Sequence, residues 1–304
     1  MGLYAEPRMV TRLDQCFFYH TMDLPGFGVV PGHWDLRENF DEYVGNIDLK
    51  GKTVLDVGTA SGFLTFEAEK RGASVVSFDV SDSSSVALLP FKDKPYYQNY
   101  PGWLKHHTQT YEPLKNGYWL AHRLYKSKAK VHYGSIYQLP PELGKFDVVI
   151  VGSVTEHLCD QIGALASISK VTGDWMVINT PMLDTDSPIA RFEGRADHPN
   201  FDYTWWVYSF GVYKEIFGML GFSIRKVTET VCSCPMYNTR QPRTTLLVQR
   251  TPPGQPTVHC SLPHKVEVQT PVHPPVHPPM RPKGVKHWMK HFIRQTVIGP
   301  ARPK

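Results

Sequence analysis

The sequence predicts an α/β fold: a doubly wound, mostly parallel sheet of seven strands in which the last strand is antiparallel. Two observations predict it. Short runs rich in β-branched residues alternate with helical or irregular stretches over residues 53–180. The first run leads into a turn of small residues and then a helix, in the stretch VLDVGTASGF at 54–63. In open sheets of this kind such turns lie at the carboxyl ends of the strands, where ligands bind.

Five runs supply the parallel strands: Thr53–Val57, Ser74–Val80, Lys130–Ile136, Phe146–Val154 and Asp174–Thr180. Two further runs, Phe222–Val231 and Thr244–Arg250, lie close enough together in the chain to form a terminal antiparallel pair. A helix is predicted over Phe63–Arg71, because it follows the turn directly and Gly72 provides a stop signal.

Two connections are longer than the fold requires and are rich in aromatic residues. About fifty residues, 81–129, join the second strand to the third, and they contain Tyr96, Tyr97, Tyr100, Trp103, His106 and His107. A second insertion, 182–210, contains FDYTWWVYSF. Such rings stack on a sugar face or a base, with Arg191, Arg195 and His198 available for an acid or phosphate. The alternative is that Trp205, Trp206 and Phe210 simply pack a cap on the sheet.

The chain is organised as an N-terminal cap (1–49), a central domain (50–251) and a tail (252–304). The tail holds twelve of the 26 prolines, and its eight Lys and Arg against one Glu give +7, which leaves −2 for the rest. This composition predicts an extended linker over 252–282. Residues 285–298 predict a basic amphipathic helix. Such a helix could bind an anionic membrane surface or RNA phosphates, or it could dock its apolar face on its own domain or on a second subunit.

Nothing in the first thirty residues resembles a signal peptide, and no run of ~20 apolar residues follows. A cytoplasmic protein is therefore expected, peripheral to the inner face of a membrane if the basic helix binds lipid. The five cysteines are odd in number and scattered, which argues against a disulfide framework. Cys232 and Cys234 form the only close pair and lack the second pair that a zinc site requires. The oligomeric state is not predicted.

The residues around the turn predict a cationic nucleotide ligand. Asp56 stands two residues before Gly58 and would repel a pyrophosphate, but it suits a cationic ligand. Asp79, at the end of the second strand, is placed to accept both hydroxyls of a ribose. Asp56 and the GxAxG spacing oppose a nicotinamide-dependent oxidoreductase. A non-catalytic module that scaffolds a partner through the tail is the other alternative.

At these residues the sequence resembles the class I S-adenosylmethionine-dependent methyltransferases, which have a Rossmann-like fold. VLDVGTASG is similar to the first motif of the family, Asp79 to its ribose-binding acid, and FDVVIVGSVTEHL to its fourth strand and following turn. The resemblance covers about residues 50–251. Within the family, the stretches 34–80 and 116–140 resemble a bacterial branch that includes wobble-uridine methyltransferases of transfer RNA and enzymes of glycan and natural-product clusters.

The resemblance implies S-adenosylmethionine as the cofactor and a set of residues that line it. These are Asp56, Gly58, Thr59, Ala60, Ser61, Gly62 and Phe63 at the turn; Asp79 and Val80; Ser135 and Ile136; Gly152 and Ser153; and Trp34 and Arg37 from the cap. Ala60 departs from the glycine usual in the family, and a slight reshaping of the turn is expected. Trp34 and Arg37 could equally belong to a surface helix start.

The predicted chemistry is methyl transfer to a hydroxyl of a small molecule or sugar, with RNA as the alternative acceptor. His157 is the candidate base, and Glu156 either orients its ring or acts as a base itself. The alternative is that Glu156 and His157 only pack or cap at the start of a helix and take no part in catalysis. Some family members bind a metal through a glutamate where this chain has Ser153, so no metal is predicted. The slight negative charge of the body argues against RNA.

Overall fold

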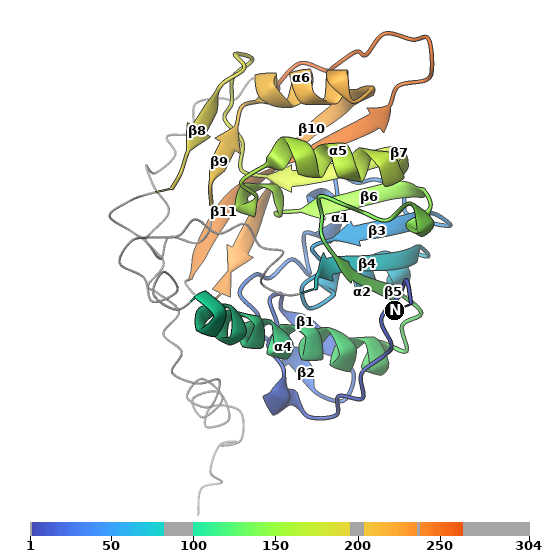
Figure 1. The fold of residues 1–304 in the computed structure, drawn as a ribbon, viewed down its shortest axis with the longest axis vertical. Helices are drawn as coiled ribbons and strands as arrows, with labels where there is room; N and C mark the ends of the chain where they lie inside the picture. Colours follow the sequence, from blue (N-terminus) through green and yellow to red (C-terminus); the bar gives the residue numbers. More distant parts are fainter. Residues whose placement is uncertain (1, 82–99, 195–203, 236–237, 264–304) are drawn as a thin grey trace, which may run out of the picture.

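The computed structural model describes residues 2–81, 100–194, 204–235 and 238–263, and for 100–110 the backbone alone. Its main sheet has seven strands in the order β10-β11-β7-β6-β3-β4-β5 (Figure 1). The strands are β3 (Thr53–Val57), β4 (Ser74–Val80), β5 (Lys130–Gly134), β6 (Phe146–Gly152), β7 (Thr172–Thr180), β10 (Phe222–Cys234) and β11 (Thr239–Arg250). Strands β3 to β7 are mutually parallel, and β11 is antiparallel to both neighbours. The predicted fold class is confirmed.

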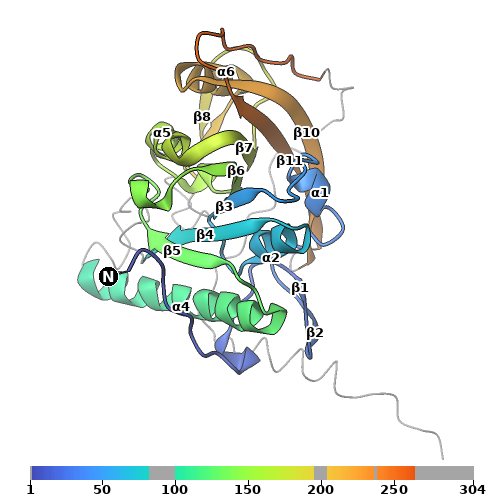
Figure 2. The ribbon, with the colours of Figure 1, turned by 90° about the vertical axis from the view of Figure 1, so that its right-hand side faces the viewer.

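Helices cover both faces of the sheet, which explains why its strands are apolar on both sides. Helices α5 (Gln161–Val171) and α6 (Phe210–Met219) cover one face, and α1 (Phe40–Tyr43) and α2 (Phe63–Lys70) the other (Figure 2). Along β6, Val148 and Ile150 pack toward the α2 side, whereas Val149 and Val151 pack toward α5 and α6. All four are fully buried or nearly so.

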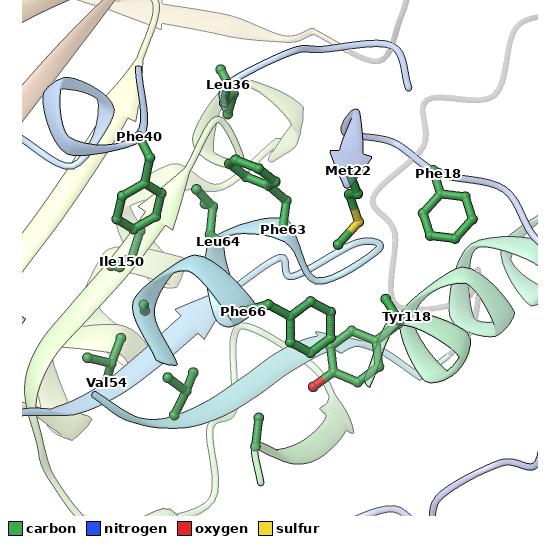
Figure 3. Close-up of a cluster of buried hydrophobic side chains, with 14 of the residues drawn as sticks. Phe18, Met22, Leu36, Phe40, Val54, Phe63, Leu64, Phe66, Tyr118 and Ile150 are labelled. Carbon is green, nitrogen blue, oxygen red and sulfur yellow. The ribbon is translucent and has the colours of Figure 1, made fainter. Parts of the chain in front are cut away.

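The N-terminal cap belongs to the core rather than lying over it. It contains a short 3-10 turn (Leu13–Gln15) and a hairpin of β1 (Met22–Leu24) and β2 (Gly28–Val30). Phe18 and Met22 lie beside Phe63, Phe66 and Tyr118, which come from α2 and α4 (Figure 3). The cap is therefore fixed by the same apolar cluster that fixes α2.

The insertion after β4 contains one long helix, α4 (Tyr100–Tyr125), which also packs on the α2 side. The Phe17 amide donates to the Pro113 carbonyl at 2.8 Å. Gly117 lies so close to the cap that a Cβ atom there would be 2.4 Å from the Phe17 carbonyl oxygen. Of the predicted aromatic group, Tyr96 and Tyr97 lie outside the described residues, as do the side chains of Tyr100, Trp103, His106 and His107.

The second insertion forms a small antiparallel pair, β8 (Ala190–Phe192) and β9 (Trp206–Tyr208). Trp205 and Phe210 are buried, which supports the packing interpretation for these two rings. Trp206 contacts Phe192 edge to face, with ring centroids 4.9 Å apart. Arg191 forms an exposed ion pair with Glu193 at 2.5 Å, while Arg195 and His198 lie outside the described residues.

Strands β10 and β11 are longer than predicted, and the extra length positions part of the site. Pairing between β11 and β7 begins at Thr244, opposite Thr180. Residues 230–234 and 239–243 therefore form a two-stranded ribbon that continues past the carboxyl end of β7. The Asp35 amide donates to the Ser233 carbonyl at 2.9 Å, which attaches the cap to this ribbon. The polar stretch TRQPR, with its proline, concealed this part of the strand from sequence analysis.

The first part of the tail lies along the outer strand β10. The Cys260 amide donates to the Ile224 carbonyl (2.8 Å), the Val258 amide to Ser223 Oγ (2.9 Å) and the Ile224 amide to His259 Nδ1 (3.1 Å). Residues 252–263 are thus part of the folded domain, whereas the sequence predicted an extended linker over 252–282. The predicted helix at 285–298 lies outside the described residues. Within the described part of the chain, no helix combines the length and apolarity needed to cross a bilayer.

Candidate cofactor and acceptor site

The small-residue turn after β3 is tightly folded against the segment that follows β6. Gly58 has a φ of 78°, and a Cβ atom on it would be 2.4 Å from Val154 Cγ2. Glycine is therefore required there for both backbone conformation and space. Ala60 also has a positive φ, 50°, which costs an alanine about 1–2 kcal/mol. The turn thus keeps the left-handed geometry that a glycine would adopt at this position.

Asp79 holds the other side of the turn. Its Oδ2 accepts a hydrogen bond from the Ala60 amide (2.7 Å), and its Oδ1 accepts one from the Val80 amide (2.7 Å). A carboxylate can accept about four hydrogen bonds, so two directions remain for a ligand. Burial raises the pKa of Asp79, although the two amides and Lys115 oppose this rise. This arrangement suits a pair of ribose hydroxyls.

Beneath the turn, four hydroxyls form a buried network that ends on Asp56. Thr65 Oγ1 donates to Asp56 Oδ2 (2.7 Å) and also contacts Ser77 Oγ (2.7 Å) and Thr59 Oγ1 (3.0 Å). Tyr118 of α4 joins through Ser77 (2.9 Å). Asp56 Oδ1 has no hydrogen-bond partner among the described residues, and burial raises the pKa of Asp56 to about 6. A buried carboxyl group with an unused oxygen fits a cationic ligand above it.

The cap contacts the turn directly. The amides of Tyr19 and His20 donate to Ser61 Oγ at 3.0 Å and 3.5 Å. The His20 ring lies 5.5 Å from the Phe63 ring, and its Nδ1 has no partner within the described structure. Burial, with repulsion from His33, lowers the pKa of His20 to about 3, so the ring is neutral. Neither Tyr19 nor His20 was predicted as a site residue.

The segment after β6 forms the floor of the site. A Cβ atom on Gly152 would be 2.8 Å from Leu64 Cδ1, so this residue must be small. Ser153 has a φ of 53°, and its Oγ donates to Asn179 Oδ1 (3.0 Å) and contacts the Tyr43 hydroxyl (3.1 Å). These bonds hold Ser153 in its left-handed conformation at the carboxyl ends of β6 and β7.

Glu156 and Arg243 form a buried ion pair at this floor. Glu156 lies in the 3-10 turn Thr155–His157, and its side chain is 3% exposed. Arg243, on the ribbon, donates from Nη1 to Glu156 Oε1 at 3.0 Å. Glu156 Oε2 is buried and has no partner among the described residues, a deficit that costs roughly 1–3 kcal/mol. Arg243 was missed because its stretch, TRQPR, was not assigned to a strand.

The aromatic side chains of the cap lie against this pair. The Arg243 guanidinium lies over the Trp34 ring, 5.5 Å from its centroid. Trp34 Nε1 donates to the Tyr19 hydroxyl at 3.2 Å. His157 follows Glu156 and is half-buried, with its amide on the Val154 carbonyl (3.1 Å). The structure thus places Trp34, Glu156 and His157 at the same end of the sheet, together with Tyr19 and Arg243, which were not among the predicted site residues.

Other predicted residues have surroundings that bear less directly on a ligand. Arg37 binds Asp35 through two hydrogen bonds (2.9 and 2.8 Å) and Asp23 through a third (3.0 Å), which favours a structural role. Ile136 is 5% exposed and packs in the core near α5, whereas Ser135 is half-buried just beyond β5. Their contribution to cofactor binding stays a prediction.

Candidate metal ligands do not come together in the described part of the chain, where no group of three His, Cys, Asp or Glu side chains is placed to hold an ion. Cys232 and Cys234 are both buried, and neither forms a disulfide bond. Burial raises the pKa of Cys232 to about 11, which makes it a poor ligand and a poor nucleophile.

Comparison with known proteins places this site in a family. A family model described as a methyltransferase domain matches residues 34–224. Among solved structures, the chain is similar to the magnesium protoporphyrin IX methyltransferase of Synechocystis PCC 6803 with bound S-adenosylhomocysteine (16% identity, TM-score 0.44, covering 71% of this chain and 82% of that one). It is also similar to a putative RNA methyltransferase of Pyrococcus horikoshii (13%, TM-score 0.43, 70% and 85%).

A third similar structure is the 1,6-didemethyltoxoflavin-N1-methyltransferase of Burkholderia thailandensis (13%, TM-score 0.41, covering 70% of this chain and 75% of that one). These likenesses are too distant to indicate which molecule this chain methylates. The family model carries the assignment, because the segment that it matches runs from the cap into β10 and covers more than half of the chain. The protein belongs to the methyltransferase domain family and is an S-adenosylmethionine-dependent methyltransferase.

Proposed function

We propose that the protein transfers the methyl group of S-adenosylmethionine to a hydroxyl of a small molecule or sugar. The observation that supports this most is Glu156, a buried carboxylate at the carboxyl end of β6 with an oxygen that lacks a donor among the described residues. A hydroxyl must lose its proton as it is methylated, and a carboxylate or imidazole beside it takes that proton. Glu156 and the adjacent His157 are the two candidate bases.

The residues at the turn fit the cofactor. Asp79 would bind the ribose. Asp56 and the small residues of the turn would contact the cationic methionine part, and Ser153 would form the floor beneath it. The cofactor supplies an electrophilic methyl group on sulfur. The protein mainly has to align an acceptor oxygen with that methyl group, and such alignment accounts for much of the rate in displacement reactions.

Transfer of a labelled methyl group into a host extract tests this proposal. The extract is separated after reaction into RNA, protein, lipid-linked glycan and small metabolites. Label in small metabolites or glycan, released as methyl iodide by hydriodic acid, is the expected result because ethers are cleaved in this way. Label confined to protein, or attached to nitrogen or carbon, would contradict it.

RNA is retained as a second acceptor class because the tail carries a charge of +7. If RNA is the acceptor, a chain that ends at residue 263 keeps the described domain but loses RNA binding. Methylation of the RNA fraction by the full chain, and its loss in the shortened chain, would replace the small-molecule proposal.

The two candidate bases are separated by His157→Ala and Glu156→Gln. If His157 is the base, His157→Ala lowers turnover roughly 100- to 10,000-fold, the usual contribution of a general base, while affinity for S-adenosylhomocysteine stays the same. Equal turnover in His157→Ala, together with a loss in Glu156→Gln, assigns the role to the carboxylate.

A further inference from the structure

The Glu156–Arg243 pair has hydrogen-bonding capacity to spare on both members. A guanidinium has five N–H donors, and within the described chain one of those of Arg243 is used, on Glu156 Oε1. Glu156 Oε2 accepts no bond there. Buried ion pairs usually satisfy their remaining donors and acceptors, because otherwise their desolvation is not compensated. One ion pair of no net charge therefore offers both unused donors and an unused acceptor.

The position of Arg243 connects this pair to the cofactor turn. Its side chain is 15% exposed although it lies beside Glu156, which is almost fully enclosed. The guanidinium lies over Trp34, Trp34 donates to the Tyr19 hydroxyl, and the Tyr19 amide donates to Ser61 in the turn. Three segments distant in sequence, the cap, the turn after β6 and the ribbon, thus meet beside the cofactor residues.

We infer that Arg243 belongs to the acceptor site, where it and Glu156 together receive the hydroxyl to be methylated. The hydroxyl would donate to Glu156 Oε2 and accept from a free N–H of Arg243. A neutral hydroxyl can do both at once and matches a pair whose charges cancel. An amine needs its lone pair for the reaction, so it gains nothing from the guanidinium. The inference rests on the proposed function, which it deepens by naming the group that binds the acceptor.

The proposed transfer moves one proton and one methyl group. The O–H bond breaks and its proton passes to Glu156 Oε2, while an oxygen lone pair forms the new bond to the methyl carbon. The C–S bond breaks, and its electron pair stays on sulfur, which becomes the neutral thioether of S-adenosylhomocysteine. Arg243 stabilises the negative charge that develops on oxygen during transfer. The carboxyl group then returns its proton to solvent.

The test compares Arg243→Ala and Arg243→Lys with a matched control, Arg250→Ala. Arg250 lies at the opposite end of β11 and donates to the Thr172 and Ser169 carbonyls, far from the turn. Each full-length variant is assayed for methyl transfer into the acceptor fraction of the extract and for S-adenosylhomocysteine affinity by calorimetry. The Arg243→Ala assay is repeated with added guanidinium chloride at millimolar concentration.

The expected result is a roughly 10- to 100-fold loss of transfer in Arg243→Ala, a smaller loss in Arg243→Lys, and cofactor affinity like that of the wild type. Added guanidinium should restore part of the transfer, and Arg250→Ala should transfer normally. Normal transfer by Arg243→Ala would overturn the inference, as would a parallel loss of cofactor affinity in both Arg243 variants. A wild-type product methylated on nitrogen would instead overturn the proposed function, whatever these variants do.

Discussion

Asp79 is the residue on which cofactor binding is expected to depend most directly. Replacing it with alanine removes the two oxygens proposed to accept from the ribose hydroxyls and also frees the Ala60 and Val80 amides that it holds. Hydrogen bonds to a charged group contribute about 1.5–3 kcal/mol, so affinity for S-adenosylhomocysteine should fall at least roughly tenfold per bond lost. Isothermal calorimetry measures this directly.

The control for Asp79→Ala is Asp147→Ala. Asp147 is also a strand carboxylate that accepts a backbone hydrogen bond, but it lies at the start of β6 and binds Thr53 at the amino-terminal end of β3, away from the turn. This variant should bind the cofactor as the wild type does. Unchanged affinity in Asp79→Ala would refute the ribose assignment.

His20 gives the protein a predictable pH dependence of stability. Its pKa is lowered to about 3 in the folded state from an ordinary value of 6.5, so below pH 6.5 the unfolded chain takes up a proton that the folded chain excludes. The stability associated with the neutral buried ring is complete above pH 6.5 and is lost as pH falls toward 3. At pH 5 this loss amounts to about 2 kcal/mol.

His20→Leu should therefore be destabilised less at pH 5 than at pH 7.5, relative to the wild type, by about 2 kcal/mol. Urea unfolding of both proteins at the two pH values measures the difference. A gap that stays constant with pH would mean that the His20 ring is already charged, or solvated, in the folded protein.

The residues that could be predicted from the sequence are those tied to short-range patterns. Gly58 and Asp79 were proposed as site residues because a strand, a turn and a helix follow one another within thirty residues. Arg243 and Tyr19 could not be proposed, because their contacts arise from pairing across the fold. The 156–243 contact joins segments 87 residues apart in sequence. Nothing local to Arg243 distinguishes it from other charged residues of the chain.

At the scale of elements, the contact between α4 and the cap allows a matched comparison of two helix glycines. Gly117→Ala places a Cβ atom 2.4 Å from the Phe17 carbonyl oxygen, so the cap must shift, at a cost of about 1–3 kcal/mol. Gly218→Ala in α6 meets nothing closer than His259 Nε2 at 3.6 Å, so it should stabilise the protein by up to about 1 kcal/mol.

Urea unfolding of the two variants should thus give changes of opposite sign. If both glycines tolerate alanine equally, the cap is not held closely against α4. Because the cap contacts Ser61, Gly117→Ala is also expected to weaken S-adenosylhomocysteine binding, whereas Gly218→Ala should not.

The elements also show where sequence patterns fail. The parallel strands were located to within a few residues, since β-branched runs with apolar residues on both faces are distinctive. β11 was placed five residues too short, because its first part has one neighbour instead of two and so lacks the apolar pattern of a central strand. The cap hairpin was not predicted, and its strands have three residues each.

At the scale of the whole molecule, residues 252–263 are expected to contribute to stability although they resemble a linker. Their three hydrogen bonds to β10 contribute about 3 kcal/mol in total, and Cys260 and Leu262 add apolar contacts. A chain that ends at residue 251 should melt several degrees below the full chain.

The matched control is a chain that ends at residue 263 and keeps all the hydrogen bonds described for the domain. It should melt close to the full chain, as followed by differential scanning fluorimetry with and without S-adenosylhomocysteine. Equal melting temperatures for the chains ending at 251 and 263 would show that the segment along β10 does not stabilise the sheet.

The position of β11 has a consequence for the order in which the protein matures on the ribosome. Among the strands of the described residues, β11 is synthesised last, yet it lies between β7 and β10. Strands β3 to β7, with the proposed cofactor residues Asp56 and Asp79, are synthesised earlier, and one edge of β7 stays unpaired until β11 follows. The growing chain is therefore expected to form the proposed cofactor residues before Arg243, the proposed acceptor residue, has been added. Pairing of β11 with β7 and β10 is therefore expected to be the step that completes the sheet and brings Arg243 beside Glu156.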